Sequence, residues 1–163
     1  MMCYMTYMKQ RVYIDTSVIG GYYDEEFKEY SRALFQEFIS GKKKIAILSD
    51  ITLAELKRAP KRIQKLVVKL PKKAVENVEM TKEADELSER YVQEGIVSRN
   101  DFVDAQHIAL ATIIHADVLV SWNFKQIVNL ERIRKYNSVN LKMGYHTLEI
   151  RTPREVLHEK EKV

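Results

Sequence analysis

The sequence predicts an α/β protein in which a central, mostly parallel sheet carries helices on both faces, giving a three-layer α/β/α domain. Its short apolar runs are continuous rather than alternating, which is typical of strands buried on both faces. Helical patterns of apolar residues separate these runs, which is typical of parallel strands joined by crossover helices. The 163 residues fit one domain, which we expect to span 11–153, with residues 1–10 and 154–163 as flexible or peripheral tails.

The first part of the chain predicts a strand, a helix and a second strand. Residues 11–15 form a β-rich run that ends at a polar residue. Apolar side chains recur at helical spacing over 29–40, and Gly41 follows as a helix stop. Residues 45–48 form the second short apolar run, so the first three elements have the order β–α–β.

Two helices are expected before the next strand. Asp50 or Thr52 can cap the first of them, which continues through Leu56. Pro60 breaks the chain and suits the first turn of the second helix, which Pro71 ends. Apolar residues lie on more than one side of this helix pair, which fits either a homodimer surface or helices buried on two faces.

The remaining elements continue the alternation of strands and helices. Residues 74–80 suit an edge strand, 81–93 an amphipathic helix, and 98–115 the longest helix. A buried strand is expected at 117–121 and a last strand at 148–150. Because ligands of such sheets gather at the carboxyl ends of the strands, residues just beyond each strand are the first candidates for a site.

The composition excludes several classes of protein. An apolar content of 45% is too high for a disordered chain, and no apolar run reaches the ~18 residues of a membrane-spanning helix. The single cysteine, Cys3, excludes a disulfide framework and a thiolate metal cluster. The amino-terminal residues lack the pattern of a secretory signal, so we expect a cytoplasmic protein.

The charge is unevenly spread, although the net charge is only +4. Residues 41–73 carry a net charge of +9, and residues 74–104 carry −6. A basic segment beside an acidic one suits a polyanion partner near a metal-binding acidic cluster. The alternative is that both segments are solvated helix faces. If the basic segment binds RNA, the candidate residues are Lys57, Arg58, Lys61 and Arg62.

Acidic and amide residues stand where such a sheet would place a site. Asp15 ends the first strand, Glu55 follows the second, and Asn123 follows the strand at 117–121. Asp101 and Asp104 lie one helical turn apart at the start of the long helix, so they share a face. We therefore expect these side chains, which are distant in sequence, to lie close together in space.

Four short motifs make the chain similar to the PIN-domain nucleases, and most similar to their VapC-like branch, the toxins of type II toxin–antitoxin pairs. The motifs are YIDTSVI at 13–19, LAEL at 53–56, DAQHIALA at 104–111 and LVSWNF at 119–124. Any one of them occurs in many folds. All four occur here in the family's order and with suitable gaps, and the resemblance extends from about residue 11 to residue 130.

The resemblance implies a Rossmann-like fold and divalent-metal-dependent cleavage of RNA by a metal-activated water. It implies that Asp15, Glu55 and Asp104 hold Mg²⁺ or Mn²⁺ and that Asn123 completes the catalytic cluster at a fourth position that is often Asp. Ser17 matches a position whose hydroxyl supports the acidic cluster. The implied partners are an RNA substrate, an antitoxin protein and a second copy of the chain in a homodimer, with no membrane involved.

The chemistry is consistent without the resemblance. Mg²⁺ is a hard ion that prefers carboxylate and water oxygens, and clustered carboxylates stay ionised together when a cation shares their site. A bound metal ion lowers the pKa of a water molecule and stabilises charge on an attacked phosphate. The sequence contains neither the His/Cys spacing of a zinc site nor a Gly-x-x-x-x-Gly-Lys loop.

Each candidate also has a purely structural interpretation. Asp15 can simply cap the following helix, Glu55 can be a surface glutamate, and Asn123 can begin a turn. Asp101 has a supporting role or only favours the positive end of the helix dipole. His107, one turn beyond Asp104, is expected to be a packing or hydrogen-bonding partner rather than a base.

Two functions remain open from the sequence. The first is a Mg²⁺- or Mn²⁺-dependent ribonuclease of the VapC-like toxin type. The second is a catalytically weak PIN-like module that binds RNA or a protein, which the absence of a fourth acid at Asn123 favours.

Overall fold

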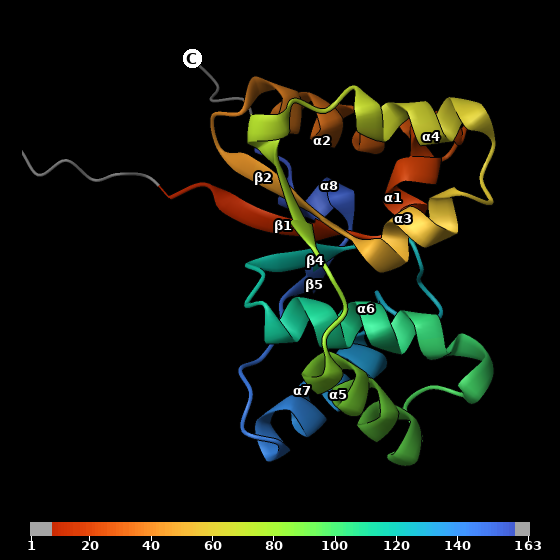
Figure 1. Ribbon diagram of the computed structural model, residues 1–163, viewed down its shortest axis with the longest axis vertical. Helices are drawn as coiled ribbons and strands as arrows, with labels where there is room; N and C mark the ends of the chain where they lie inside the picture. The colour runs from red at the N-terminus through yellow and green to blue at the C-terminus, as the bar shows by residue number, and fades with distance from the viewer. Residues whose placement is uncertain (1–7, 159–163) are drawn as a thin grey trace, which may run out of the picture.

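A five-stranded sheet forms the centre of the computed structural model, which describes residues 8–158 (Figure 1). All strand pairs are parallel, and the order across the sheet is β3-β2-β1-β4-β5. The strands are β1 (Gln10–Ile14), β2 (Lys44–Ser49), β3 (Val75–Val78), β4 (Val118–Val120) and β5 (Ile150–Arg151). Of the tails expected at 1–10 and 154–163, residues 1–7, with Cys3, and residues 159–163 lie outside the described residues.

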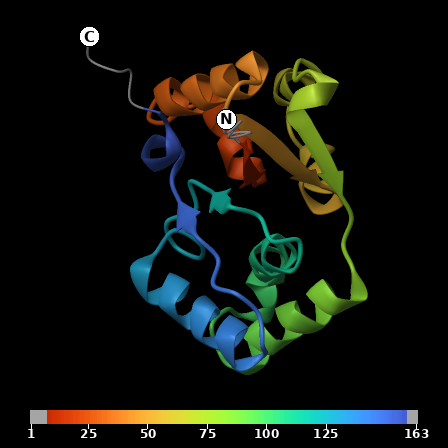
Figure 2. The same cartoon turned by 90° about the vertical axis from the view of Figure 1, so that its left-hand side faces the viewer.

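Helices cover both faces of the sheet, as the continuous apolar runs predict. The helices are α1 (Thr16–Gly20), α2 (Lys28–Ser40), α3 (Asp50–Leu56), α4 (Lys61–Val68), α5 (Lys82–Gln93), α6 (Phe102–Ile113), α7 (Leu130–Lys142) and α8 (Pro153–Val156). Three short 3₁₀ turns join them at Gly21–Tyr23, Lys72–Ala74 and Arg99–Asp101. Figures 1 and 2 show α1, α2 and α4 on one side of the sheet and α5, α6 and α7 on the other.

The core is split in two because neighbouring side chains of a strand point to opposite faces. In β1, Val12 and Ile14 pack into the core beneath α1, α2 and α4. Tyr13, which lies between them, packs into the other core with α5, α6 and α7. The same alternation occurs in β2 and β4, so each central strand is buried on both faces and the predicted three-layer class is confirmed.

Several predicted element boundaries are shifted. The cap of α3 is Ser49, not Asp50 or Thr52, because Ser49 is extended and its Oγ accepts from the Thr52 N–H at 3.1 Å. Asp50 is the first helical residue, and its carboxylate instead accepts from the backbone N–H of Met80. The long helix expected from residue 98 begins as a 3₁₀ turn, and α6 starts only at Phe102.

Two further helices were not expected from the pattern. Helix α7 buries Tyr136, Val139 and Asn140. Because one of these buried residues is polar, the sequence does not show a continuous apolar face at helical spacing. Helix α8 begins at Pro153, where the domain was expected to end, and its Val156 packs against the core beneath α2. The chain therefore stays in contact with the core beyond residue 153.

An arginine side chain ties α6 to the sheet. The Arg11 guanidinium donates to the carbonyl oxygens of Ile114 and His115, which follow the last turn of α6, at 3.0 and 2.9 Å. It also pairs with Glu76 of the edge strand β3, at 2.9 Å. This contact satisfies carbonyl groups that the end of a helix leaves without partners.

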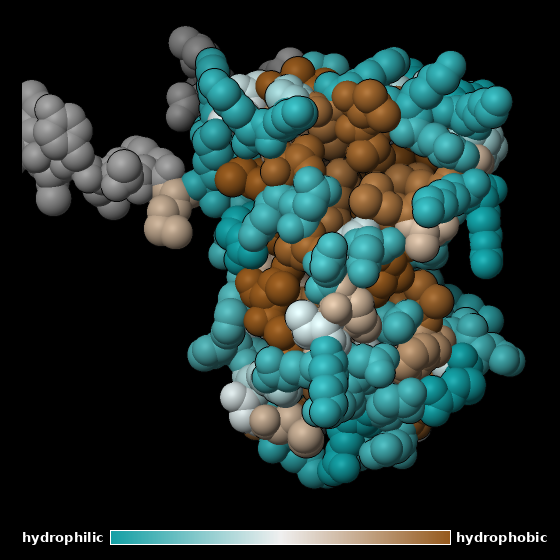
Figure 3. Space-filling view, viewed as in Figure 1, coloured by the Kyte–Doolittle hydropathy of each residue, from teal (hydrophilic) through white to brown (hydrophobic). Residues whose placement is uncertain are grey.

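Some apolar side chains remain on the surface. Leu53 of α3, Val103 of α6 and Val68 of α4 are 38%, 40% and 84% exposed. Figure 3 shows hydrophobic side chains gathered in the middle of one face, with hydrophilic side chains around them. Among residues 8–158, no helix combines the length and hydrophobicity that crossing a membrane requires.

Gly21 lies where the chain leaves α1 against the buried Trp122 ring. A Cβ atom at Gly21 would lie 2.6 Å from Ser31 Oγ and 2.8 Å from Trp122 Nε1, and both residues are buried. We therefore expect Gly21→Ala to lower the free energy of unfolding by about 1–3 kcal/mol, the usual cost of overpacking. Urea denaturation followed by tryptophan fluorescence measures this.

Gly20→Ala is the matched control for this prediction. Gly20 has helical backbone angles, and a Cβ there meets no atom within 4 Å. The control should be neutral or more stable, by up to about 1 kcal/mol. Equal destabilisation by both substitutions would contradict the steric explanation.

Candidate active site

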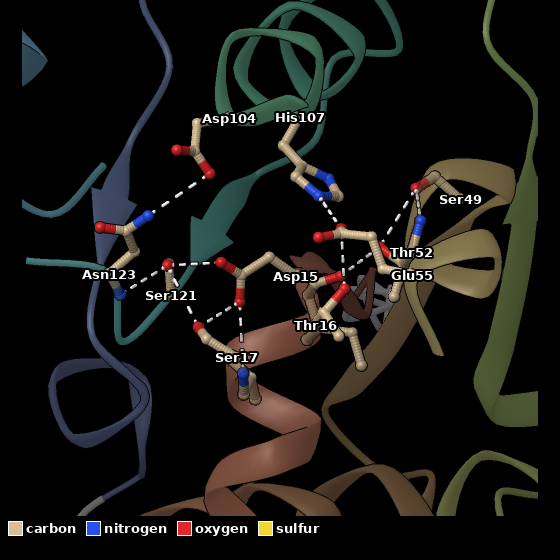
Figure 4. Close-up of polar contacts among 12 residues, drawn as sticks. Asp15, Thr16, Ser17, Ser49, Thr52, Glu55, Asp104, His107, Ser121 and Asn123 are labelled. Atoms are coloured by element: carbon tan, nitrogen blue, oxygen red, sulfur yellow. Dashed lines mark hydrogen bonds and ion pairs between the residues drawn. The ribbon is translucent and has the colours of Figure 1, made fainter. Parts of the chain in front are cut away.

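The predicted acidic residues lie around the carboxyl ends of the central strands. Asp15 follows β1, Glu55 lies on α3 after β2, and Asn123 follows β4. Figure 4 shows His107 reaching from α6 to Glu55, and Asp104 reaching from the same helix to Asn123. The site is therefore assembled from the ends of two strands, β1 and β4, and from two helices, α3 and α6.

Asp15 is the most enclosed acid of the site. Its side chain is 4% exposed, and its Oδ1 accepts from Ser17 Oγ at 2.6 Å and from the Val18 N–H at 3.2 Å. Its Oδ2 accepts from Ser121 Oγ at 2.5 Å. Burial raises the pKa of Asp15 above its usual value, although His107 and the two serine hydroxyls oppose the shift. Asp15 caps α1 and also faces the site, so its geometry fits both a helix-capping role and a role in the site.

Of the three acids at the site, Asp104 accepts the fewest hydrogen bonds within the described part of the chain. Its pKa is raised to about 6, chiefly by burial and further by the charges of Asp15, Asp101 and Glu55, against the opposing effect of His107. The one side-chain hydrogen bond to Asp104 comes from Asn123 Nδ2, at 3.3 Å, within the described part of the chain. Its environment therefore favours a cation.

Asn123 turns its amide nitrogen toward the site. Its Oδ1 accepts the backbone N–H of Gln126 at 3.0 Å, which leaves Nδ2 to face Asp104. Its backbone N–H is held by Ser121 Oγ at 2.9 Å. In this arrangement Asn123 both begins a turn and positions Asp104, and its carbonyl oxygen is directed away from the acids.

Glu55 is oriented by two donors on opposite sides of the site. Its Oε1 accepts from Thr16 Oγ1 at 2.8 Å and lies 2.7 Å from His107 Nε2. Burial raises the pKa of Glu55, but the hydrogen bond and the charge of His107, together with Thr16, outweigh burial and lower it. Glu55 therefore enters the site as a carboxylate.

His107 belongs to a directed chain of hydrogen bonds. Its Nδ1 lies 2.7 Å from the Tyr13 hydroxyl, which donates to Ser49 Oγ at 2.8 Å. Ser49 in turn donates to Thr52 Oγ1, at 3.2 Å. The two ring nitrogens therefore have different partners, with Nδ1 facing the Tyr13 hydroxyl and Nε2 facing the Glu55 carboxylate. His107 thus connects Tyr13 of β1 to Glu55 of α3.

Asp101 stands at the edge of the cluster. Its Oδ2 accepts from Ser98 Oγ and from Gln126 Nε2, both at 3.0 Å. It contributes to the raised pKa of Asp104, one turn further along the helix. Gln126 links this acid to the turn that Asn123 begins.

The donor set suits a hard divalent cation, because the side chains that face the site are carboxylates and the pKa values of Asp15 and Asp104 are raised. Nevertheless, among residues 8–158 no group of three or more His, Cys, Asp and Glu side chains lies close enough together to hold a metal ion. Each acid is instead held toward its own partners: Asp15 toward serines, Glu55 toward His107 and Thr16, and Asp104 toward Asn123.

Sequence reasoning missed several residues that organise these acids. Thr16 and Ser121 contact the acids directly, and Tyr13 supports His107. Thr16 and Tyr13 lie close to Asp15 in the first motif, and Ser121 precedes Asn123 in the last one, so position in a motif was the available signal. Ser17 lies where the resemblance implies, with its hydroxyl on Asp15.

The candidate RNA-binding residues follow the end of α3 and continue into α4. Arg58 lines a hollow that also contains Glu55. Arg62 lies over the Tyr23 ring, 4.7 Å from its centre. Lys57 directly follows the end of α3, Lys61 directly precedes Arg62, and both lysines are exposed. The four basic residues therefore begin close to Glu55 in the sequence and continue into α4.

Among the hollows on the surface of residues 8–158, one lies at the amino ends of the strands and another at their carboxyl ends. The larger, of about 1090 Å³, is lined by Gln10, Asp117 and Glu149 at the amino ends of strands. The smaller, of about 560 Å³, adjoins Glu55 and Thr16. The smaller one belongs to the site, because ligands of parallel sheets bind at the carboxyl ends of the strands.

Comparison with solved structures gives two similar folds. VapC20 of Mycobacterium tuberculosis, a toxin that cleaves the sarcin–ricin loop, aligns with a TM-score of 0.54 and 15% identity over 70% of this chain and 91% of that chain. A chain of VapBC2 of Rickettsia felis, bound to a promoter DNA fragment, aligns with a TM-score of 0.52 and 18% identity, covering 86% of this chain and 97% of its own. This chain has the fold of a VapC toxin. The predicted resemblance is thus confirmed at the level of the fold. No family model and no curated protein matches the sequence.

The raised pKa of Asp104 makes a prediction about stability. Between about pH 4 and pH 6 the folded carboxyl keeps its proton while the unfolded one loses it, so ionisation destabilises the folded chain as the pH rises. Asp104→Asn removes this cost and retains an oxygen for Asn123. In EDTA at pH 7.5 we expect the variant to melt about 2–6 °C above the parent.

The measurement is thermal unfolding of both proteins in EDTA from pH 4.5 to pH 7.5. The difference in melting temperature should grow across this range and level off above about pH 6.5. A difference that does not depend on pH would show that the carboxylate charge is not the cause.

Proposed function

We propose that the chain is a divalent-metal-dependent endoribonuclease of the VapC-like toxin type. The observation that carries the proposal is the convergence of Asp15, Glu55 and Asp104 at one edge of the sheet, where the pKa values of Asp15 and Asp104 are raised. Such a concentration of negative charge is costly to the fold and is relieved when a cation binds. The fold shared with the VapC toxins supports the same conclusion.

In this proposal Asp15, Glu55 and Asp104 hold Mg²⁺ or Mn²⁺. The bound cation would neutralise charge at the attacked phosphate and acidify a coordinated water. Thr16 and His107 hold the Glu55 carboxylate in one orientation. Asn123 orients Asp104 through its amide nitrogen and completes the catalytic cluster without a fourth negative charge.

The RNA backbone would follow the basic residues that begin beside Glu55. Lys57, Arg58, Lys61 and Arg62 continue directly from α3 into α4. Phosphate contacts of this kind are independent of sequence and position the strand. Asp101, which is hydrogen-bonded to Ser98 and Gln126, would not contact the RNA backbone.

The proposed biological role is that of a toxin held inactive by an antitoxin protein. The solved structure of VapBC2 bound to promoter DNA supports a partner of this kind. We also propose a homodimer, because Leu53 and Val68 of the α3–α4 region expose apolar surface. The RNA target places the proposed action in the cytoplasm.

A catalytically weak RNA- or protein-binding module is the second candidate. It is favoured by the orientation of Asn123, whose oxygen is used by Gln126 and which therefore offers the site only a donor. A site with three rather than four acids binds cations less strongly. The two candidates differ in whether RNA is cleaved in a metal-dependent way.

We expect cleavage of a labelled RNA pool in Mg²⁺ or Mn²⁺ and no cleavage in EDTA. Asp15→Asn should lower the metal-dependent rate by about a hundredfold or more, because it removes a charge from the cation site. The control is Asp85→Asn, the same change at an exposed position of α5, with identical purification. Cleavage that survives Asp15→Asn would be a contaminant, and metal binding without cleavage would favour the binding module.

The salt dependence of RNA binding tests the basic segment. In the Asp15→Asn background, the logarithm of the RNA affinity should fall linearly with the logarithm of the salt concentration. Replacing both Lys57 and Lys61 by Ala should reduce the slope by about 0.7 for each RNA phosphate that these side chains neutralise in the parent. Filter binding between about 50 and 200 mM salt covers the useful range.

The control replaces Lys42 and Lys43, which lie at the opposite edge of the sheet. This pair removes the same charge and should leave the salt slope close to that of the parent. If both pairs reduce the slope equally, net charge rather than a defined RNA path explains the binding.

A further inference from the structure

The hollow between α3 and α6 has the composition of a site for one flat, partly apolar ring. It is lined by apolar side chains from both helices, Ile51 and Ala54 on α3 and Val103 on α6. Its polar lining includes Gln106 and Arg58. Its volume of about 560 Å³ falls in the range usual for small-molecule sites.

Two of the lining side chains are available to a ligand. Among residues 8–158, no hydrogen bond or ion pair engages the side chain of Gln106 or of Arg58. By contrast, Asp50, which also lines the hollow, already accepts the backbone N–H of Met80 with both carboxylate oxygens. The hollow therefore presents one free amide and one free guanidinium against an apolar wall.

The position of the hollow connects it to the reaction. Glu55 and Thr16 form part of its lining, and both belong to the proposed catalytic site. A nucleotide whose phosphate lies at the three acids would have its base one sugar away, and the hollow adjoins that position through Glu55 and Thr16. Unpaired RNA bases are recognised in this way, with the ring against apolar or guanidinium surfaces and its edge hydrogen-bonded to a side chain.

We propose that the α3–α6 hollow binds one unpaired nucleobase of the RNA, next to the phosphate that is cleaved. Val103 and Ile51 pack against the ring, and the Gln106 amide, which has both a donor and an acceptor, reads its edge. Arg58 stacks on the ring or neutralises the phosphate that follows it. This inference rests on the proposed function and adds the feature that gives the site a sequence preference.

Two variants address the hollow without touching the acids. Gln106→Leu removes the hydrogen bonds and keeps the size of the side chain, and Ala54→Leu fills the hollow from an exposed position. The control is Gln36→Leu, the same change on an exposed part of α2. Melting temperatures of all variants establish that each is folded.

The experiment is cleavage of an RNA pool of random sequence in Mg²⁺ and Mn²⁺, with every cleavage site determined by sequencing. We expect the parent and Gln36→Leu to prefer certain bases at one position beside the cleaved bond. Gln106→Leu should reduce that preference about fivefold or more at this one position. Ala54→Leu should raise KM more than it lowers kcat, because it obstructs binding. Unchanged base preferences in both variants would overturn the proposal.

A crosslinking experiment separates failure of this proposal from failure of the proposed function. Asp15→Asn protein is irradiated with an RNA oligonucleotide that contains 4-thiouridine, and the crosslinked peptide is identified by mass spectrometry. Crosslinks to 51–58 or 103–106 support the base site even if the parent cleaves no RNA. Crosslinks that form only elsewhere overturn the proposal. The proposal is also overturned if Gln106→Leu and Ala54→Leu change only the mass of the oligomer, because the hollow would then be a contact between protein chains.

Discussion

The buried carboxylate of Asp15 is the constraint on which the rest of the site depends. A charged group at 4% exposure is tolerated only when its oxygens are hydrogen-bonded, and here the donors come from two separate parts of the chain. Ser17 and the Val18 N–H belong to α1, and Ser121 follows β4. Ser17 Oγ also accepts the Trp122 N–H at 2.9 Å. The strand β1, the start of α1 and the end of β4 must therefore keep their relative positions to satisfy one acid.

The three acids differ in how many hydrogen bonds they accept, and an acid with few hydrogen bonds is suited to binding a cation. Within residues 8–158, Asp15 accepts three hydrogen bonds and Glu55 contacts Thr16 and His107, whereas Asp104 has one donor at 3.3 Å and a pKa of about 6. A fold selected only for stability would not keep such a group at this place, because ionising it opposes folding at neutral pH. The cost is explained if a cation is bound during function.

Much of the fold follows from the sequence, because buried parallel strands are continuous apolar runs and Gly41 and Gly95 end their helices with positive φ. That Asp15 and Asn123 lie at one edge of the sheet could be predicted from the rule that strand ends share one edge. The contact of His107 with Glu55 could not be predicted, because the two residues lie 52 positions apart in the sequence and their contact depends on how α6 packs over the sheet. Helix α7 was missed because its buried face includes the polar Asn140.

The departure at Asn123 has a simple electrostatic interpretation. The three proposed ligands are carboxylates, and burial already raises the pKa of Asp15 and of Asp104. An aspartate at 123 would place a further carboxylate beside Asp104, whose pKa is already raised, and would lose the amide donor that now holds it. The amide therefore has three effects at this site: its oxygen accepts from the Gln126 N–H, its nitrogen donates to Asp104, and it adds no further negative charge beside the acids.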